Sequence, residues 1–94
     1  MHHDKRYKTI NVVSCGHEED GAVLYNPDTD NTSVVNLSAR ELWAFLETPH
    51  TTGEIVDHLL KVYSNVSVEQ ATEDVKLFID NLVPDFLQEI TDAD

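Results

Sequence analysis

The sixteen residues from Thr32 to Glu47 change from a strand pattern to a helix pattern without a linker, which constrains the fold more than any other part of the chain. Residues 32–35 are β-branched apart from one serine, and this composition favours a half-buried strand. After residue 38, apolar residues recur at the spacing of one helix face: Ala39, Leu42, Trp43 and Leu46. The sequence therefore predicts a strand that leads directly into a helix.

Three helix starts are indicated by side chains that cap helices. In a capping box, a Ser or Thr hydroxyl accepts from the third backbone N–H of the helix, and a Glu or Gln at that position reaches back. Three pairs have this spacing: Ser38 and Glu41, Thr51 and Glu54, and Ser67 and Gln70. We predict helices that begin within about two residues of Ser38, Thr51 and Ser67.

Three strands are predicted before the first helix, at residues 7–13, 22–26 and 32–35. Residues 15–21 form a predicted polar loop with a glycine near each end, and residues 26–31 have the Pro, Asp and Asn content of a turn. The strands should form one antiparallel sheet, with no strand after residue 50. Phe86, Leu87 and Ile90 are expected to form a short apolar tail that folds back as a last turn.

The predicted fold class is α+β, a three-stranded antiparallel sheet followed by three helices. Its 94 residues and 40% apolar content suit one small domain over residues 1–94, with residues 1–6 and 91–94 expected to be flexible.

The formal charge of −12 limits the partners that the protein can bind. Six basic residues cannot neutralise a row of phosphates, so nucleic acid and anionic membrane surfaces are disfavoured. No run of about 18 apolar residues indicates a membrane span, and no secretory signal is evident. One cysteine, Cys15, fits a reducing compartment, so we expect a cytoplasmic protein with basic or neutral partners.

Side chains for catalysis or metal binding are not arranged in any recognisable motif. The sequence contains no phosphate-binding glycine loop, no H-E-x-x-H and no C-x-x-C. Cys15, His17, His50 and His58 lack the paired spacing of metal ligands, and His58 on a polar helix face is expected to be solvated. We predict no enzyme activity, no catalytic residue, no metal and no cofactor.

The third predicted strand is suited to binding a peptide through its backbone. It carries no charged residue or proline that would protect a sheet edge, so a further strand could pair with it. Leu77 lies away from the inward stripe of the third helix and could form a pocket wall. The predicted peptide-binding residues are Thr32, Ser33, Val34, Val35 and Asn36 on the strand, and Asp74, Leu77, Phe78 and Asn81 on the helix.

Several segments, in order, resemble the PqqD family, the small proteins known as RiPP precursor peptide recognition elements. They are Val23-Leu24-Tyr25-Asn26, Val35-Asn36-Leu37-Ser38, Leu42-Trp43-x-x-Leu46, Thr52 with Glu54 and Ile55, residues 59–63, and Asp74-Val75-x-x-Phe78-Ile79-x-x-Leu82. The resemblance runs from about Gly21 to Leu87. The sequence departs from the family pattern at Pro84-Asp85, where the family usually has a glycine before the last apolar pair.

The resemblance implies a winged-helix-like bundle of three helices beside the sheet. It also implies that the leader of a precursor peptide adds to the third strand and lies against the third helix. The protein would then be a non-catalytic chaperone that presents the peptide to a modifying enzyme, such as a radical-SAM maturase, a cyclase or a protease.

Two other functions fit parts of the sequence. A structural or assembly subunit could pair with a second copy through the open strand and form a homodimer. A winged-helix DNA-binding domain would need a basic recognition helix. The third predicted helix instead carries four acidic residues, Glu69, Glu73, Asp74 and Asp80, against Lys76 alone.

Overall fold

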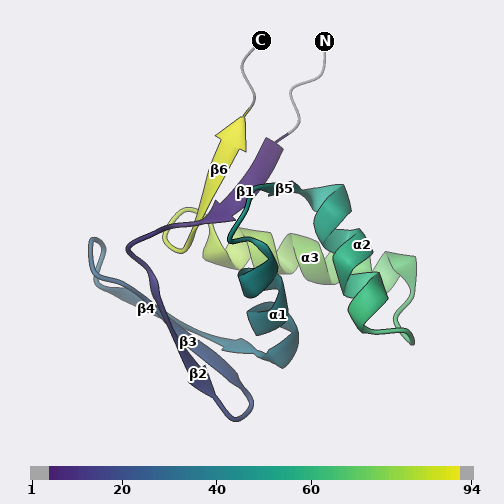
Figure 1. Cartoon of the computed structure of the whole chain (residues 1–94), viewed down its shortest axis with the longest axis horizontal. Helices are drawn as coiled ribbons and strands as arrows, with labels where there is room; N and C mark the ends of the chain where they lie inside the picture. The colour runs from purple at the N-terminus through teal and green to yellow at the C-terminus, as the bar shows by residue number, and fades with distance from the viewer. Residues whose placement is uncertain (1–4, 92–94) are drawn as a thin grey trace.

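A computed structural model describes residues 5–91, in which two antiparallel sheets accompany three helices (Figure 1). One sheet has the order β2-β3-β4, with β2 at Ser14–Glu18, β3 at Gly21–Asn26 and β4 at Asn31–Asn36. The other has the order β5-β1-β6, with β5 at His50–Thr51, β1 at Lys5–Thr9 and β6 at Leu87–Thr91. The helices are α1 at Leu37–Phe45, α2 at Thr52–Val62 and α3 at Val68–Leu82. The predicted α+β class, with a three-stranded antiparallel sheet and three helices, is confirmed.

The first predicted strand is wrong in its extent and in its sheet. Residues 7–13 do not form one strand, because β1 ends at Thr9 and a turn separates it from β2. The predicted loop at residues 15–21 is instead largely β2, which pairs with β3 from Ser14↔Tyr25 to Glu18↔Gly21. β3 has good strand propensity, and pairing with it explains why the polar, glycine-containing segment of β2 is extended.

The second sheet contradicts the expectation that no strand follows residue 50. The C-terminal apolar segment forms β6 instead of the expected last turn, and it pairs with β1 from Lys5↔Thr91 to Thr9↔Leu87. Lys5, Arg6 and Thr91, expected to be flexible, therefore lie in strands, while residues 1–4 and 92–94 are outside the described residues. β1 and β6 lie side by side at one end of the molecule, away from the tip of the β2–β3 hairpin (Figure 1).

All three helices begin within two residues of the predicted sites, but the first has a different cap. Asn36 caps α1, and its Oδ1 accepts from the backbone N–H of Ala39 at 2.8 Å. Asn is as good a cap as Ser, so the helix starts directly at the end of β4, and Ser38 lies inside it. The full capping box of Thr51 and Glu54 and the Ser67 cap are confirmed.

The core lies where the inner faces of the helices meet the inner faces of both sheets. Leu24, Leu46, Ile55, Val75, Leu82 and Leu87 are its largest fully buried side chains. Trp43 is 7% exposed and belongs to the same cluster. Tyr7 in β1 and Leu87 in β6 bring the second sheet into this core, so strands from both ends of the described chain complete it.

Phe45 is stacked between two histidine rings, which corrects the expectation that His58 is solvated. The His50 and His58 ring centroids lie 3.9 Å and 4.0 Å from that of Phe45, with nearly parallel planes. His58 Nε2 lies 3.0 Å from Glu41 Oε2, and His50 Nδ1 lies 3.2 Å from Glu54 Oε1. Glu41 therefore contacts α2 rather than closing the predicted capping box at Ser38.

Candidate functional site

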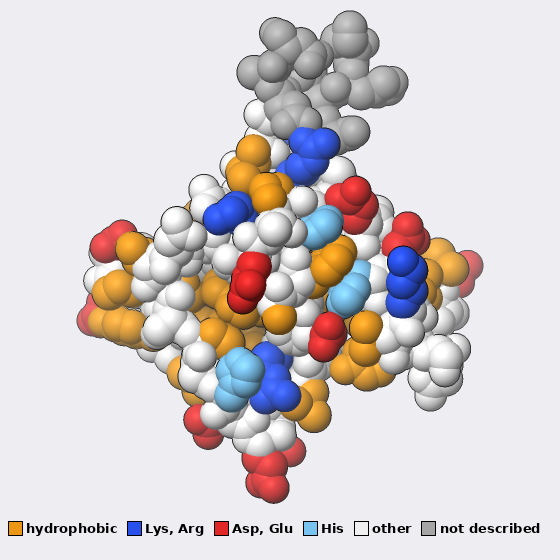
Figure 2. Space-filling model, in the orientation of Figure 1, with side chains coloured by type: hydrophobic (Ala, Val, Ile, Leu, Met, Phe, Trp, Pro, Cys, Tyr) orange, Lys and Arg blue, Asp and Glu red, His pale blue; other side chains and the backbone are white. Residues whose placement is uncertain are grey.

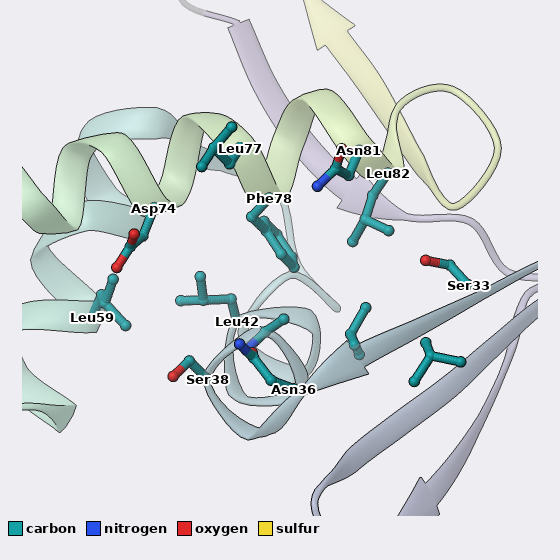
Figure 3. Close-up of a pocket in the computed structure, with 13 residues that line it drawn as sticks. Ser33, Asn36, Ser38, Leu42, Leu59, Asp74, Leu77, Phe78, Asn81 and Leu82 are labelled. Atoms are coloured by element: carbon teal, nitrogen blue, oxygen red, sulfur yellow. The ribbon is translucent and has the colours of Figure 1, made fainter.

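A cleft of about 530 Å³ runs between β4 and α3, and α1 and α2 contribute to its lining (Figure 3). Its volume is within the range of roughly 300–1,000 Å³ that is typical of ligand sites. The lining residues are Ser33, Val34, Val35, Asn36, Ser38, Ala39, Leu42, Leu59, Asp74, Leu77, Phe78, Asn81 and Leu82.

The structure brings together all of the predicted peptide-binding residues except Thr32. Four of these lie on β4, namely Ser33, Val34, Val35 and Asn36, and four lie on α3, namely Asp74, Leu77, Phe78 and Asn81. Thr32 is exposed on β4 and its side chain is not part of the lining.

Sequence reasoning missed the residues that form the floor of the cleft. Leu42, Leu59 and Leu82 are at most 3% exposed, yet one side of each lines the cleft. Their helical spacing indicated core positions, and they are indeed in the core. Ser38 and Ala39 line the cleft because α1 begins one residue after β4, which places its first turn beside the strand end.

The two long walls of the cleft run in opposite directions. Ser33 lies near Leu82 and Asn81, whereas Asn36 and Ser38 lie toward Asp74 and Leu59 (Figure 3). β4 therefore runs antiparallel to α3, and each end of the cleft has its own lining.

β4 is an edge of its sheet and lacks the usual protection of an edge. Its sequence, NTSVVN, contains no charged residue or proline, and the sheet order leaves its far side unpaired among the described residues. Val34 is 78% exposed and Leu77, on the opposite wall, is 55% exposed. A strand with this edge and these apolar neighbours can accept a further strand.

The pairing of β3 with β4 determines which backbone groups face the open side. The carbonyl oxygen of Val35 lies where the Cβ of any larger residue at Gly21 would be, so Val35 directs its polar groups toward β3. Opposed residues of an antiparallel ladder alternate between hydrogen-bonded and unbonded pairs. Ser33 is therefore also directed toward β3, and the polar backbone groups of Thr32 and Val34 face the cleft side.

Contacts at one end of the cleft join its two walls. Asn31 Nδ2 donates to Asp85 Oδ2 at 2.7 Å, and Asn26 Nδ2 donates to the Asp85 backbone oxygen. Asn31 begins β4, and Asp85 lies in the loop after α3. These bonds hold the start of the strand against the end of the helix.

Side chains for catalysis are not gathered in the cleft. Burial raises the pKa of the Cys15 thiol, an effect that Arg40 opposes only in part, so the reactive thiolate is disfavoured. Among residues 5–91, no three His, Cys, Asp or Glu side chains are grouped so that they could hold a metal ion.

Within the same residues, none of the helices has the length and apolar character needed to span a bilayer.

The basic side chains visible on one face of the molecule are isolated from one another, while acidic ones occur both across this face and around its outline (Figure 2). This distribution matches the formal charge of −12 and provides no basic surface on that face for a phosphate backbone.

Two comparisons with known proteins match the chain over most of its length. A family model described as "Coenzyme PQQ synthesis protein D (PqqD)" matches residues 21–84, which include β3, β4, all three helices and the whole cleft. Comparison with curated proteins finds no match.

One solved structure is similar in fold and in sequence. Its title is "TbiB1 in Complex with the TbiA(beta) Leader Peptide", and it superposes with a TM-score of 0.67 at 25% identity. The similarity covers 80% of this chain and 86% of that chain.

Proposed function

Because the chain belongs to the PqqD family, we propose that it binds the leader segment of a ribosomally made precursor peptide in the cleft between β4 and α3. The observation that carries this proposal is the uncharged edge of β4, which is unpaired among residues 5–91, beside a cleft of suitable size. The similar TbiB1 structure, which contains a leader peptide, supports the choice of ligand.

Strand addition explains how one short segment could be bound without a deep pocket. Backbone hydrogen bonds from Thr32 and Val34 would supply affinity, and alternate side chains of the peptide would enter the cleft and supply specificity. Leu42, Leu77 and Phe78 offer apolar contacts at the centre, where a bound side chain would be removed from water.

The protein itself would be a non-catalytic chaperone. In this proposal it presents the bound precursor to a separate modifying enzyme, such as a radical-SAM maturase, a cyclase or a protease. The raised thiol pKa of Cys15 and the lining of the cleft, which offers one carboxylate and no basic group among the described residues, support a binding role over a catalytic one.

Amide hydrogen exchange on complexes with leader peptides tests the proposal. The Val34 amide should exchange quickly in the free protein and slowly with peptide bound, whereas the Ser33 amide should be protected in both states. The proposal is wrong if peptides bind while the exchange of Thr32 and Val34 is unchanged.

A homodimer that pairs through β4 is a second candidate, since the same open edge would serve it. The two functions predict different molecular masses for the free protein in solution. Light scattering on the free protein should give a monomer if the edge is kept for a leader peptide, and a dimer that dissociates on peptide addition would show that both use the same edge.

A further inference from the structure

The cleft has an electrostatic polarity along its length. Of the described residues that line it, only Asp74 is charged, and it lies at the end formed by Asn36, Ser38 and Leu59 (Figure 3). Gln70 Nε2 donates to Asp74 Oδ1 at 2.8 Å and holds the carboxylate in place. The opposite end is lined by the uncharged Ser33, Asn81 and Leu82.

The spacing of α3 matches the spacing of an added strand. Asp74, Phe78 and Leu82 are four residues apart along one side of the helix, so neighbours are displaced by about 6 Å along its axis. Side chains on one face of a strand are about 6.8 Å apart, because every second residue points the same way. Three successive inward positions of a bound strand would therefore face Asp74, Phe78 and Leu82 in turn.

From this match we infer that the cleft selects a basic–x–apolar–x–apolar segment, with Lys or Arg beside Asp74 and apolar side chains over Phe78 and Leu82. The inference rests on the proposed function and specifies the peptide that it takes. The formal charge of −12 adds a general attraction for a cationic segment.

The direction of the segment follows from the sheet. The β2-β3-β4 sheet is antiparallel throughout, and antiparallel pairs outnumber parallel ones about two- to three-fold in proteins. A strand antiparallel to β4 runs in the same direction as α3, so its N-terminal end lies beside Asp74. The basic residue precedes the apolar ones.

The test uses three synthetic peptides of about nine residues, capped at both ends. The first has Lys, Leu and Val at its third, fifth and seventh positions and Thr elsewhere. The second replaces Lys by Glu, and the third has the sequence of the first in reverse. Exposed ion pairs contribute modestly, so the Lys peptide should bind about fivefold to tenfold more tightly than the Glu peptide at low salt. It should also bind more tightly than the reversed peptide.

Two charge-reversal variants separate a local contact from the overall field. Asp74→Lys and Glu73→Lys change the net charge equally, but Glu73 is exposed on α3 outside the cleft lining. Asp74→Lys should invert the preference so that the Glu peptide binds more tightly, whereas Glu73→Lys should preserve it. Equal effects of the two variants, or equal affinities of the Lys and Glu peptides for the parent, would overturn the inference.

The outcome also distinguishes this inference from the proposed function. If leader peptides protect the Val34 amide but show no preference at the position beside Asp74, the function stands and the sequence preference is wrong. If the reversed peptide binds more tightly, the direction is wrong. If no peptide, leader or synthetic, protects Val34, the proposed function itself fails.

Discussion

Asn31 and Asp85, 54 residues apart in sequence, are joined by a 2.7 Å hydrogen bond between Asn31 Nδ2 and Asp85 Oδ2. This contact lies at the end of the cleft where the two walls meet, and Asn26 adds a second bond to the backbone of Asp85. The separation of β4 from α3 is thus fixed at one end by side chains that line no part of the cleft.

Removing this contact should loosen the cleft more than it unfolds the protein. Asp85→Ala removes a hydrogen bond worth about 1 kcal/mol, so we expect the melting temperature to fall by about 4–8 °C. Peptide affinity should fall about threefold or more, because the Asn26 bond to the Asp85 backbone is then the remaining described hydrogen bond between the walls at this end. Asn31→Ala should have the same effect, and the double variant little more, whereas additive losses would show that the two side chains act independently.

Proline substitutions at neighbouring positions of β4 should have opposite consequences. Val34→Pro removes a donor that faces the open side, so peptide affinity should fall at least tenfold while the melting temperature stays near that of the parent. Ser33→Pro removes a backbone N–H from the ladder to β3. The backbone carbonyl oxygen of Leu24 then has no donor, at a cost of about 1–3 kcal/mol. Calorimetry and peptide titration on both variants provide the test. Normal peptide binding by Val34→Pro would refute strand addition at this edge.

Leu77 should contribute to binding and not to stability. It is 55% exposed in the free protein, so Leu77→Asn should change the free energy of unfolding by less than about 1 kcal/mol. Loss of an apolar contact in the complex should weaken peptide binding about fivefold to thirtyfold. Val68→Asn is the matched control, because Val68 is similarly exposed on α3 but does not line the cleft. Similar losses in both variants would place the peptide elsewhere.

Trp43 should be essential for folding. It is 7% exposed in the core, and Trp43→Ala should destabilise the protein by about 3–5 kcal/mol. Small domains are stable by only about 5–15 kcal/mol, so this loss is a large share of the total, and circular dichroism should show a melting temperature lowered by more than about 10 °C. A melting temperature within a few degrees of the parent would contradict the burial of this side chain.

Acid should remove the contribution of the α2 capping box. The Thr51 backbone N–H, followed by His50, lowers the pKa of the Glu54 carboxyl below its ordinary value of 4.5. Since the unfolded chain takes up the proton first, this stabilisation is present above pH 4.5 and is lost as the pH falls through the lower pKa of the folded state. The melting temperatures of the parent and of Glu54→Ala should therefore differ at pH 7 and converge below pH 4.5. A difference that is constant with pH would be inconsistent with an ionised cap.

The features of the fold that the sequence predicted are those determined by local chemistry. Thr51 and Ser67 cap their helices as expected, because a cap needs only its own first turn. β2 and β6 were missed because their extended conformation depends on distant partners. The sequence Ser-Cys-Gly-His-Glu has little strand propensity and is held by β3, and Leu87 pairs with Thr9.

The lining of the candidate cleft could be predicted to the extent that it consists of exposed residues. In the sequence, the uncharged strand and Leu77, which lies off the inward stripe of its helix, indicated two walls of a binding site. The structure places these two walls on either side of one cleft. The floor could not be distinguished from the core, because Leu42 and Leu82 serve as both. The hydrogen bond between Asn31 and Asp85 could not be predicted from the sequence, because two residues 54 positions apart form no local pattern.

The pairing of β1 with β6 imposes an order on synthesis and folding. β1 can pair with β5 early, but its other side stays open until Leu87 and the rest of β6 leave the ribosome, because only then can β6 join the second sheet and complete the core. Contacts of such long sequence separation form slowly. During that interval the unprotected edge of β4 is exposed on an incomplete protein, so it is the segment through which newly made chains would aggregate.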